Sequence, residues 1–455
     1  MLLKSINPAN GEIIREYEEF HWDDVAETIE ANYLAFHSWK KTPISERAKL
    51  LRKATEVLRD KKEGLAFNIT VEMGKNIKES RAEVEKCALV CEYYSDNGSK
   101  FLEREIIETD ATESYASLQP LGPVLAIMPW NFPLWQVFRF AAPALMAGNV
   151  GLLKHASNVP ACALAIEEVF VEAGFPKDVF RTLLIRSNKV ERIIADKRIK
   201  AVTLTGSTPA GKEVAATAGK HLKKCVLELG GSDPYIILED ADIEKAVDAC
   251  VAGRVLNAGQ SCIGAKRFII VESVYDAFTE LFVDKMRNIS LGDPIDENKQ
   301  MGPLARFNLR EDLHMQVENS INKGAKLLTG GYIPQRDGAF YPATVLGDVQ
   351  AGMAAYHEEL FGPVASLIKA KDEADAIRIA NDSIFGLGAA VFTQDVSRGK
   401  RIAEEEMDAG CCFVNDFVRS DPRLPFGGVK ESGFGRELSH YGMKEFMNIK
   451  GIWIK

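Results

Sequence analysis

The sequence lacks the features that would place the chain in a membrane or outside the cell. No apolar run approaches the roughly 20 residues that span a bilayer. The first residues, MLLKSINPANGEII, turn polar at Lys4 and contain no apolar core of signal-peptide length. The 8 cysteines are scattered apart from Cys411-Cys412, with no CxxC pair and no Cys/His cluster at zinc-ligand spacing. We therefore expect a cytoplasmic protein with reduced thiols, no membrane partner and no metal site.

A block of lysine and arginine is also missing. The chain has 455 residues and a formal net charge of −9. An acidic balance without a basic cluster argues against a general nucleic-acid binder. We find no internal repeat and no low-complexity segment. The 46% hydrophobic share is that of an ordinary globular protein, and the length is sufficient for two or three domains.

Short apolar runs alternate with helical patterns along the middle of the chain. This alternation predicts an α/β fold with a parallel sheet and right-handed crossovers. A helical layer is expected over residues 22–100, and a second α/β unit over residues 231–426. The alternating tail from Asn448 to Lys455 predicts an edge strand, which is a natural place to add a subunit. The buried strands of the first unit are expected at residues 122–129, 150–154, 180–185 and 201–205.

The candidate nucleophile is Cys262, in the stretch NAGQSC. Small residues precede it, and the polar amide of Gln260 lies two positions before it. This setting suits a thiol that substrate must reach and whose backbone N–H must face a reacting oxygen. A free cysteine more often packs as a small hydrophobe. The hexapeptide alone therefore leaves catalysis and packing equally open.

A carboxylate and a glycine turn are further candidates. Glu228 lies in the apolar stretch CVLELGG, where its pKa should be raised, as a general base near neutral pH requires. The alternative is a structural glutamate bound to backbone N–H groups. The strand at 201–205 runs into Gly206-Ser207 and a helix, which places helix N–H groups where a pyrophosphate could bind. The turn is not GxGxxG, so a simple tight βα turn remains the alternative.

Seven motifs in order resemble the NAD(P)-dependent aldehyde dehydrogenase superfamily over nearly the whole chain: PWNFP, LLK, TGS, LELGG, NAGQSC, EELFGPV and PFGG. The resemblance implies a homodimer or homotetramer. It also implies three parts: a Rossmann-like cofactor domain over residues 1–112 and 122–230, an α/β catalytic domain over residues 231–428, and a small β oligomerisation arm over residues 113–121 and 440–455.

The resemblance implies oxidation of an aldehyde to a carboxylic acid through a thiohemiacetal and a thioester. Cys262, as thiolate, would attack the aldehyde carbon. The side-chain amide of Asn131 and the backbone N–H of Cys262 would bind the oxyanion. After hydride transfer to the nicotinamide, Glu228 would activate the water that hydrolyses the thioester.

The resemblance also implies the cofactor residues. Lys154 would bind the adenosine ribose, and Glu359 the nicotinamide ribose. Many NAD-using members carry an acidic residue three positions after this lysine, whereas this chain has Ser157, which does not repel a 2′-phosphate. We predict NADP as the preferred cofactor, with NAD as the alternative. The other implied cofactor residues are Pro129, Trp130, Gly206, Ser207, Gly230 and Phe361.

The stretch KHASNVP resembles a branch of bacterial succinate-semialdehyde dehydrogenases. In that branch the position of Arg139 is thought to bind the distal carboxylate, and a guanidinium suits a bidentate carboxylate. Arg139 could instead lie at the surface or between domains. Ser420 is a second candidate for the carboxylate, and Phe426 would wall the pocket. The chain departs from some animal relatives at Leu256, where they carry an arginine, and at Gly264, where they carry a second cysteine.

Three other interpretations remain open. The first is the same chemistry on an uncharged aliphatic or aromatic aldehyde, which is favoured if Arg139 does not reach the pocket. The second is a CoA-acylating enzyme, against which the hydrolytic base Glu228 argues. The third is a non-catalytic binding protein that has kept the fold. The presence of Cys262, Glu228 and Asn131 together argues against it.

Overall fold

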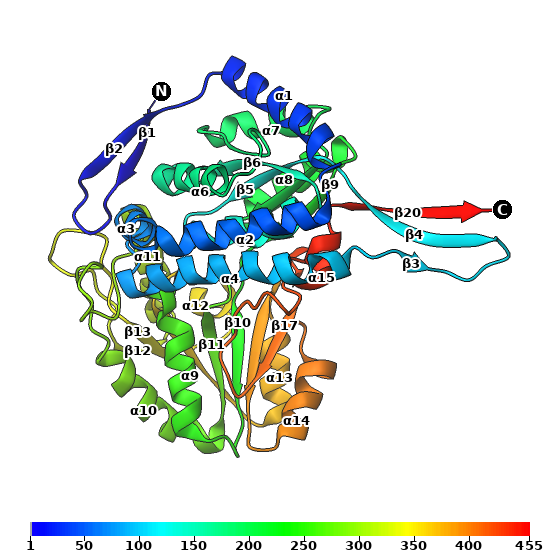
Figure 1. Cartoon of the computed structure of the whole chain (residues 1–455). Helices are drawn as coiled ribbons and strands as arrows, with labels where there is room; N and C mark the ends of the chain where they lie inside the picture. The colour runs from blue at the N-terminus through cyan, green and yellow to red at the C-terminus, as the bar shows by residue number, and fades with distance from the viewer. Residues whose placement is uncertain (1) are drawn as a thin grey trace.

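The computed structural model describes residues 2–455. It contains two α/β bodies, a layer of long helices along the first of them, and a projecting arm (Figure 1). An antiparallel hairpin, β1 (Leu2–Ile6) and β2 (Ile13–Glu18), opens the chain. Residues 22–100 are mostly helical, as expected, and form four helices. These are α1 (Trp22–Trp39), α2 (Ile44–Asp60), α3 (Lys62–Met73) and α4 (Ile77–Phe101).

The first sheet has six strands in the order β19-β9-β8-β5-β6-β7. The five strands from β9 to β7 are parallel, and the short β19 joins β9 antiparallel. Apolar runs without alternation form these strands because helices cover both faces. The strands are β5 (Pro123–Met128), β6 (Val150–His155), β7 (Phe180–Thr182), β8 (Ala201–Thr205), β9 (Lys224–Glu228) and β19 (Gly433–Phe434), and the helices between them are α5 (Trp135–Met146), α6 (Pro160–Glu172), α7 (Val190–Ala195) and α8 (Thr208–Lys220).

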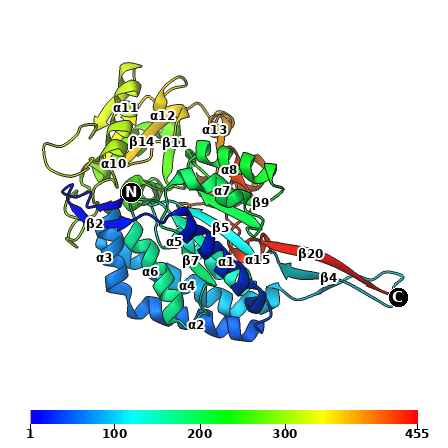
Figure 2. The ribbon, with the colours of Figure 1, turned by 90° about the horizontal axis from the view of Figure 1, so that it is seen from above.

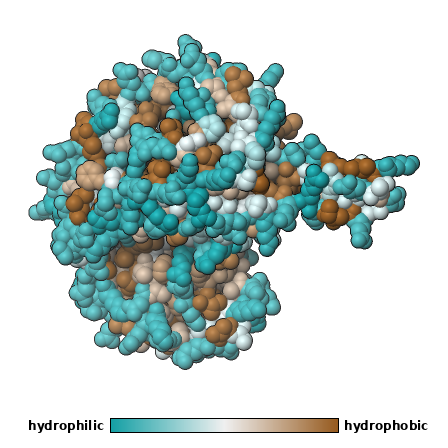
Figure 3. All heavy atoms as spheres, viewed as in Figure 1, coloured by the Kyte–Doolittle hydropathy of each residue, from teal (hydrophilic) through white to brown (hydrophobic). Residues whose placement is uncertain are grey.

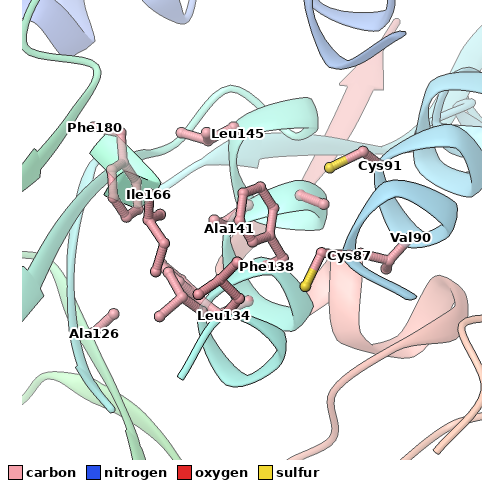
Figure 4. Close-up of a cluster of buried hydrophobic side chains, with 14 of the residues drawn as sticks. Cys87, Val90, Cys91, Ala126, Leu134, Phe138, Ala141, Leu145, Ile166 and Phe180 are labelled. Atoms are coloured by element: carbon pink, nitrogen blue, oxygen red, sulfur yellow. The ribbon is translucent and has the colours of Figure 1, made fainter. Parts of the chain in front are cut away.

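Helix α5 is buried along its whole length and forms the centre of the first core. Figure 4 shows Leu134, Phe138 and Leu145 between the side chains of α4 on one side and those of α6 and β7 on the other. Cys87 and Cys91 of α4 pack here as small apolar groups, and burial raises the pKa of both thiols. They are structural thiols.

The second sheet has seven strands in the order β12-β13-β14-β11-β10-β16-β17, parallel except for β12. It corresponds to the second α/β unit expected from the sequence. Its strands are β10 (Asp233–Ile237), β11 (Ala265–Val271), β12 (Lys326–Thr329), β13 (Thr344–Gly347), β14 (Val364–Ala370), β16 (Gly388–Phe392) and β17 (Cys411–Val414). Its helices are α9 (Ile243–Val255), α10 (Tyr275–Arg287), α11 (Phe307–Asn322), α12 (Ala354–His357), α13 (Glu373–Asn381) and α14 (Val396–Arg401).

The arm is a three-stranded sheet in the order β20-β4-β3. Strand β4 (Glu113–Pro120) pairs antiparallel with β20 (Met447–Ile454) along its full length, and β3 (Glu105–Ile106) covers the other edge of β4. Figure 2 shows the arm reaching away from both bodies, with the C-terminus near its tip. Ile449 and Trp453 of β20 are 66% and 57% exposed, and Figure 3 shows apolar atoms gathered on the arm.

Helix α11 begins at Phe307 and not earlier, because the N–H of Leu304 donates to the carbonyl of Ala339 and that of Ala305 to the side chain of Gln260. The path of the chain after the second body differs from the sequence-based expectation. The chain returns to the first sheet, through β19 and then α15 (Ser439–Lys444). The minor pair β15 (Phe385–Gly386) and β18 (Val429–Lys430) precedes this return. No helix in residues 2–455 is long and apolar enough to cross a membrane.

Candidate active site

Four parallel strands of the first sheet end at one edge, and predicted site residues follow each of them. Asn131 comes after β5, Lys154 lies at the end of β6, Gly206 follows β8, and Glu228 ends β9. Ligands of open α/β sheets bind in the crevice beyond the carboxyl ends of the strands. Here the second body closes the crevice, since Cys262 precedes β11 and Glu359 precedes β14.

A cavity of about 350 Å³ occupies this crevice. It is lined by most of the residues that the sequence assigned to the nucleophile and to the dinucleotide, and by four that it did not single out. The predicted residues are Pro129, Trp130, Asn131, Gly206, Ser207, Gly230, Cys262, Glu359 and Phe361. The others are Thr205, Leu229, Arg306 and Leu309.

The loop that delivers Cys262 has three consecutive residues with positive φ. These are Asn257 at 55°, Ala258 at 51° and Gly259 at 73°. A left-handed conformation costs a non-glycine residue about 1–2 kcal/mol, so other contacts must hold the loop. Both carboxylate oxygens of Glu79 accept the N–H of Asn257, at 3.1 and 3.2 Å, and Arg254 donates to the carbonyl of Gly259 at 2.6 Å. The loop is therefore held before any ligand binds.

Gly259 has a second reason to be glycine. A Cβ there would lie 2.3 Å from the backbone carbonyl carbon of Gly362, in the segment that follows Glu359. The nucleophile loop and the EELFGPV segment thus pack backbone against backbone. A side chain at this position would separate them.

Lys266 lies beneath the nucleophile. Its ammonium is 1% exposed and donates to the carbonyls of Ser261 at 2.9 Å, Cys262 at 2.8 Å and Gly264 at 3.3 Å. A trans peptide is planar, with its N–H opposite its C=O. Because Lys266 holds the Ser261 carbonyl, the N–H of Cys262 points away from the lysine. This buried lysine therefore orients the backbone donor that the sequence assigned to the oxyanion.

Asn131 is joined to the same loop. Its side-chain N–H donates to the carbonyl of Gln260 at 3.0 Å, and its own carbonyl accepts the side-chain N–H of Asn257 at 2.7 Å. An amide nitrogen has two donors, so the second N–H of Asn131 is available to a ligand. The predicted oxyanion donor and the predicted nucleophile are thus brought together across about 130 residues of sequence.

The surroundings of Cys262 favour the neutral thiol. Burial raises its pKa to about 12, and the positive charges of Arg139 and Lys266 act in the opposite direction. The thiolate is the nucleophilic form. Cys262 must therefore lose a proton before it can attack, and the two cations reduce the cost of that loss.

Glu228 is a deeply buried acid at the end of β9. It is 1% exposed, and neither carboxylate oxygen has a hydrogen-bond partner among residues 2–455. Burial raises its pKa well above the ordinary value, and the charge of Glu437 adds to this, while Arg139 opposes it. An unpaired carboxyl with a raised pKa has the property that a general base near neutral pH requires. Glu228 is not among the residues that line the large cavity.

Glu359 lies at the dinucleotide side of the large cavity. One carboxylate oxygen accepts the N–H of Gly231 at 3.0 Å and lies 3.6 Å from the ammonium of Lys266. A Cβ on Gly230 would lie 2.5 Å from its other oxygen. The LELGG glycine therefore allows the carboxylate to approach the backbone. Beside it, the rings of Phe361 and Trp130 meet edge to face at 5.7 Å.

Lys154 and Ser157 lie outside the lining of this cavity, at the carboxyl end of β6. Lys154 is half-buried, and burial lowers its pKa. Within residues 2–455 its ammonium has no hydrogen bond or ion pair, which leaves it available to a ligand. Ser157 is exposed in the following turn. His155, beside Lys154, is a packing residue, because its Nε2 lies 2.8 Å from the Pro133 carbonyl and burial lowers its pKa to about 4.

A second, smaller cavity of about 50 Å³ is also lined by Cys262. The three predicted substrate residues line it as well: Arg139, Ser420 and Phe426. Cys262 thus lies between a large cleft suited to a dinucleotide and a small cavity suited to the rest of a substrate. Lys86, Trp135 and Arg419 line the small cavity too, although the sequence did not single them out.

Arg139 reaches the small cavity with a charge that is already compensated. Its guanidinium forms a buried ion pair with Glu437, donates to the hydroxyl of Thr205 at 3.3 Å and stacks over Phe426 at 4.6 Å. Its role as a carboxylate clamp stays a prediction. Glu437 follows β19, in the segment where the chain returns to the first sheet. The sequence did not predict this return.

The comparisons with known proteins define the class. The model of the "Aldehyde dehydrogenase family" matches residues 2–452, and the chain belongs to this family. A protein named "Probable succinate-semialdehyde dehydrogenase [NADP(+)]" from Synechocystis sp. is 46% identical over 454 residues and 100% of both chains. "Succinate semialdehyde dehydrogenase [NAD(P)+] Sad" of Escherichia coli is 49% identical over 449 residues, covering 99% of this chain and 97% of that one.

Solved structures agree. The succinic semialdehyde dehydrogenase of Streptococcus pyogenes, in complex with NADP+, is 37% identical, with a TM-score of 0.97 over 99% of both chains. A protein called Gox0499 is 38% identical, with a TM-score of 0.98 over 100% of both chains. The family resemblance and the α/β fold class predicted from the sequence are thereby confirmed.

Proposed function

We propose that this protein oxidises succinate semialdehyde to succinate and prefers NADP. The observation that carries the proposal is the position of Cys262, which lines both the large cleft and the small cavity. An aldehyde carbon on the thiol can therefore face a nicotinamide on one side while the rest of the substrate occupies the other. The relatives named above support both the substrate and the cofactor.

The residues present fit a dinucleotide. Ser207 and Gly206 open helix α8, whose first N–H groups and dipole favour a pyrophosphate. Glu359 would bind the nicotinamide ribose, and Lys154 the adenosine ribose. When bound, the nicotinamide supplies the acceptor for the hydride that leaves the substrate carbon. Ser157 favours NADP because its hydroxyl can donate to a 2′-phosphate, whereas a carboxylate there would repel one.

Attack on the aldehyde is the first task of the chain's own residues. The thiolate of Cys262 adds to the carbonyl carbon and leaves a negative oxygen. The second N–H of Asn131 and the backbone N–H of Cys262 would stabilise this oxygen, and one such donor contributes about 3 kcal/mol in comparable sites. Lys266 keeps the backbone donor in place through the Ser261 carbonyl.

Hydrolysis of the thioester is the second task. Glu228 would take a proton from a water molecule as the hydroxide adds to the thioester carbon. The carbon–sulfur bond then breaks, the carboxylic acid leaves, and the sulfur of Cys262 is free for another cycle. The raised pKa of Glu228 suits this role, since a carboxylate with an ordinary pKa would be a weaker base.

The size of the small cavity favours a short aliphatic substrate. An engineered apolar cavity that binds benzene has a volume of about 150 Å³, whereas this one is about 50 Å³. A short uncharged aldehyde is the second candidate, because Phe132, Ile263 and Val418 give the cavity apolar walls. The cations that also line it favour the charged substrate.

The deciding measurement is kcat/KM for succinate semialdehyde against butanal, each with NADP and NAD. We expect a preference of at least 100-fold for the charged aldehyde and a clear preference for NADP. Equal kcat/KM for the two aldehydes would replace the proposal with a broad-range aldehyde dehydrogenase. A higher kcat/KM with NAD would overturn the assignment of Ser157.

We also propose that the chain acts as a homodimer or homotetramer in the cytoplasm, with the domain boundaries predicted from the sequence. The free edge and exposed apolar side chains of β20 support an arm that binds a second copy. The 8 cysteines are all free thiols, which supports a reducing compartment.

A further inference from the structure

We infer that Lys86, together with Ser420, binds the distal carboxylate of the substrate, in place of the Arg139 clamp predicted from the sequence. The inference rests on the proposed function, since it names the group that recognises the charged end of an ω-carboxy aldehyde. Lys86 lies on helix α4 and Ser420 in the loop after β17, and both line the small cavity.

Lys86 already contacts the hydroxyl that would share the ligand. Its ammonium donates to the Oγ of Ser420 at 2.8 Å, and the indole N–H of Trp135 donates to the same oxygen at 3.1 Å. The hydroxyl accepts two hydrogen bonds, so its own proton remains to be donated. Ser420 is 8% exposed and lines the cavity. Its free proton and two remaining protons of Lys86 are the donors that a carboxylate would take.

The charge of Lys86 is free, unlike that of the other two cations that line the cavity. Arg139 is paired with Glu437, and Arg419 with Asp416 at 2.6 Å. Among residues 2–455, Lys86 has no carboxylate within ion-pair distance. A cation that is already paired with a carboxylate attracts a further anion weakly. The electrostatic attraction for the substrate carboxylate is therefore strongest at Lys86.

The two acidic residues near Lys86 are committed elsewhere. Glu83, one turn before it on α4, pairs with Lys75 and accepts the N–H groups of Leu134 and Trp135. Asp421 pairs with Arg423 at 2.6 Å. Neither is free to occupy the position of the ligand.

The ammonium of Lys86 is largely removed from water. Its ammonium lies 4.2 Å from the centre of the Trp135 ring, where a cation–π contact stabilises the charged form. Burial and the charge of Arg139 lower the pKa of Lys86 to about 8. A bound carboxylate would raise it again. The positive charge of Lys86 thus has no paired negative charge until an anion binds.

The test is the substrate dependence of Lys86→Met, which removes the charge and keeps the length of the side chain. We expect kcat/KM for succinate semialdehyde to fall at least 30-fold, mainly through KM, and kcat/KM for butanal to stay within about threefold. Lys100→Met, at an exposed position of the same helix, is the matched control and should change neither value. Lys86→Gln, which keeps a donor to Ser420, replaces the first variant if that one does not fold.

The outcomes separate the inference from the proposed function. A wild-type enzyme without preference for the charged aldehyde overturns both. A wild-type preference that survives in Lys86→Met or Lys86→Gln overturns only the role of Lys86. Loss of activity on both aldehydes to the same extent, in a folded variant, also overturns it, because a carboxylate contact cannot affect butanal.

Discussion

The ammonium of Lys266 lies 2.9 Å from the carbonyl oxygen of Ser261, directly before the nucleophile. Two further carbonyls, those of Cys262 and Gly264, accept from the same nitrogen. One buried cation therefore sets the direction of the Cys262 N–H, lowers the cost of a thiolate and lies 3.6 Å from Glu359. The positive charge of Lys266 therefore acts on both the nucleophile and the carboxylate on the cofactor side of the site.

Replacing Lys266 by Met should lower kcat by about 10- to 100-fold. The Ser261–Cys262 peptide loses its anchor, and loss of an oxyanion donor costs roughly 100- to 1000-fold in comparable sites. The thiol should also become harder to ionise. The rate of alkylation by iodoacetamide as a function of pH measures this directly. Lys371→Met, at an exposed position in the same body, is the control. An unchanged pH profile would restrict Lys266 to a structural role.

Replacing Glu228 by Gln should slow hydrolysis of the thioester more than the steps before it. Rapid mixing with NADP and aldehyde should then show a burst of reduced cofactor near one equivalent per site, followed by turnover slowed at least 100-fold. Cys262→Ala should give neither burst nor turnover while it still binds NADP. A Glu228→Gln variant that turns over at the wild-type rate would remove Glu228 from the mechanism.

Glu79 should make stability depend on pH. Burial raises its pKa from 4.5 to about 7, against the hydrogen bond from Asn257 and the charge of Lys75. A carboxyl with a raised folded pKa contributes stability that is lost as pH rises from the unfolded to the folded pKa, here from about 4.5 to 7. Glu79→Gln should therefore gain stability relative to wild type across this window, by up to about 3 kcal/mol.

Urea unfolding of wild type and Glu79→Gln at pH 5 and pH 8 checks this. Glu63→Gln, at an exposed position on α3, is the control. A difference in unfolding free energy that is the same at both pH values would show that Glu79 titrates normally.

Ser157→Glu should shift the cofactor preference. A carboxylate at this position repels the 2′-phosphate and accepts from a ribose 2′-hydroxyl. We expect kcat/KM with NADP to fall 10- to 100-fold while the value with NAD stays equal or rises. Ser187→Glu, at another exposed position of the first body, controls for added charge. A loss shared equally by both cofactors would place the 2′-phosphate elsewhere.

Trp453→Lys should weaken assembly through the arm. Trp453 is 57% exposed on the free strand β20, and a charge on an edge strand opposes pairing with another copy. Light scattering of wild type should give the mass of a dimer or tetramer, and the variant should dissociate at a higher protein concentration. Lys450→Gln on the same strand is the control. Equal dissociation constants for wild type and Trp453→Lys would show that this part of β20 does not form the interface.

How far the sequence alone predicts the site differs from residue to residue. Nine of the residues that line the large cleft belong to predicted motifs near strand ends, and a strand end is a local property that apolar runs and turn residues specify. Lys86 offers no such signal, because it is one charged residue among many on α4, and Ser420 lies 334 positions away. Lys266 opens a buried strand, where a charge is unusual, so it could have been noticed.

The amino-acid sequence by itself determined the α/β class, the approximate positions of several strands along the chain, the family, and the choice of Cys262, Asn131 and Glu228 as candidates. These follow from patterns read within short stretches. Only the tertiary structure decided which charges are free. Arg139 is neutralised by Glu437, which the return through β19 brings beside it, while Lys86 meets no carboxylate among the described residues. Charge compensation depends on distance in space, and distance in sequence does not specify it.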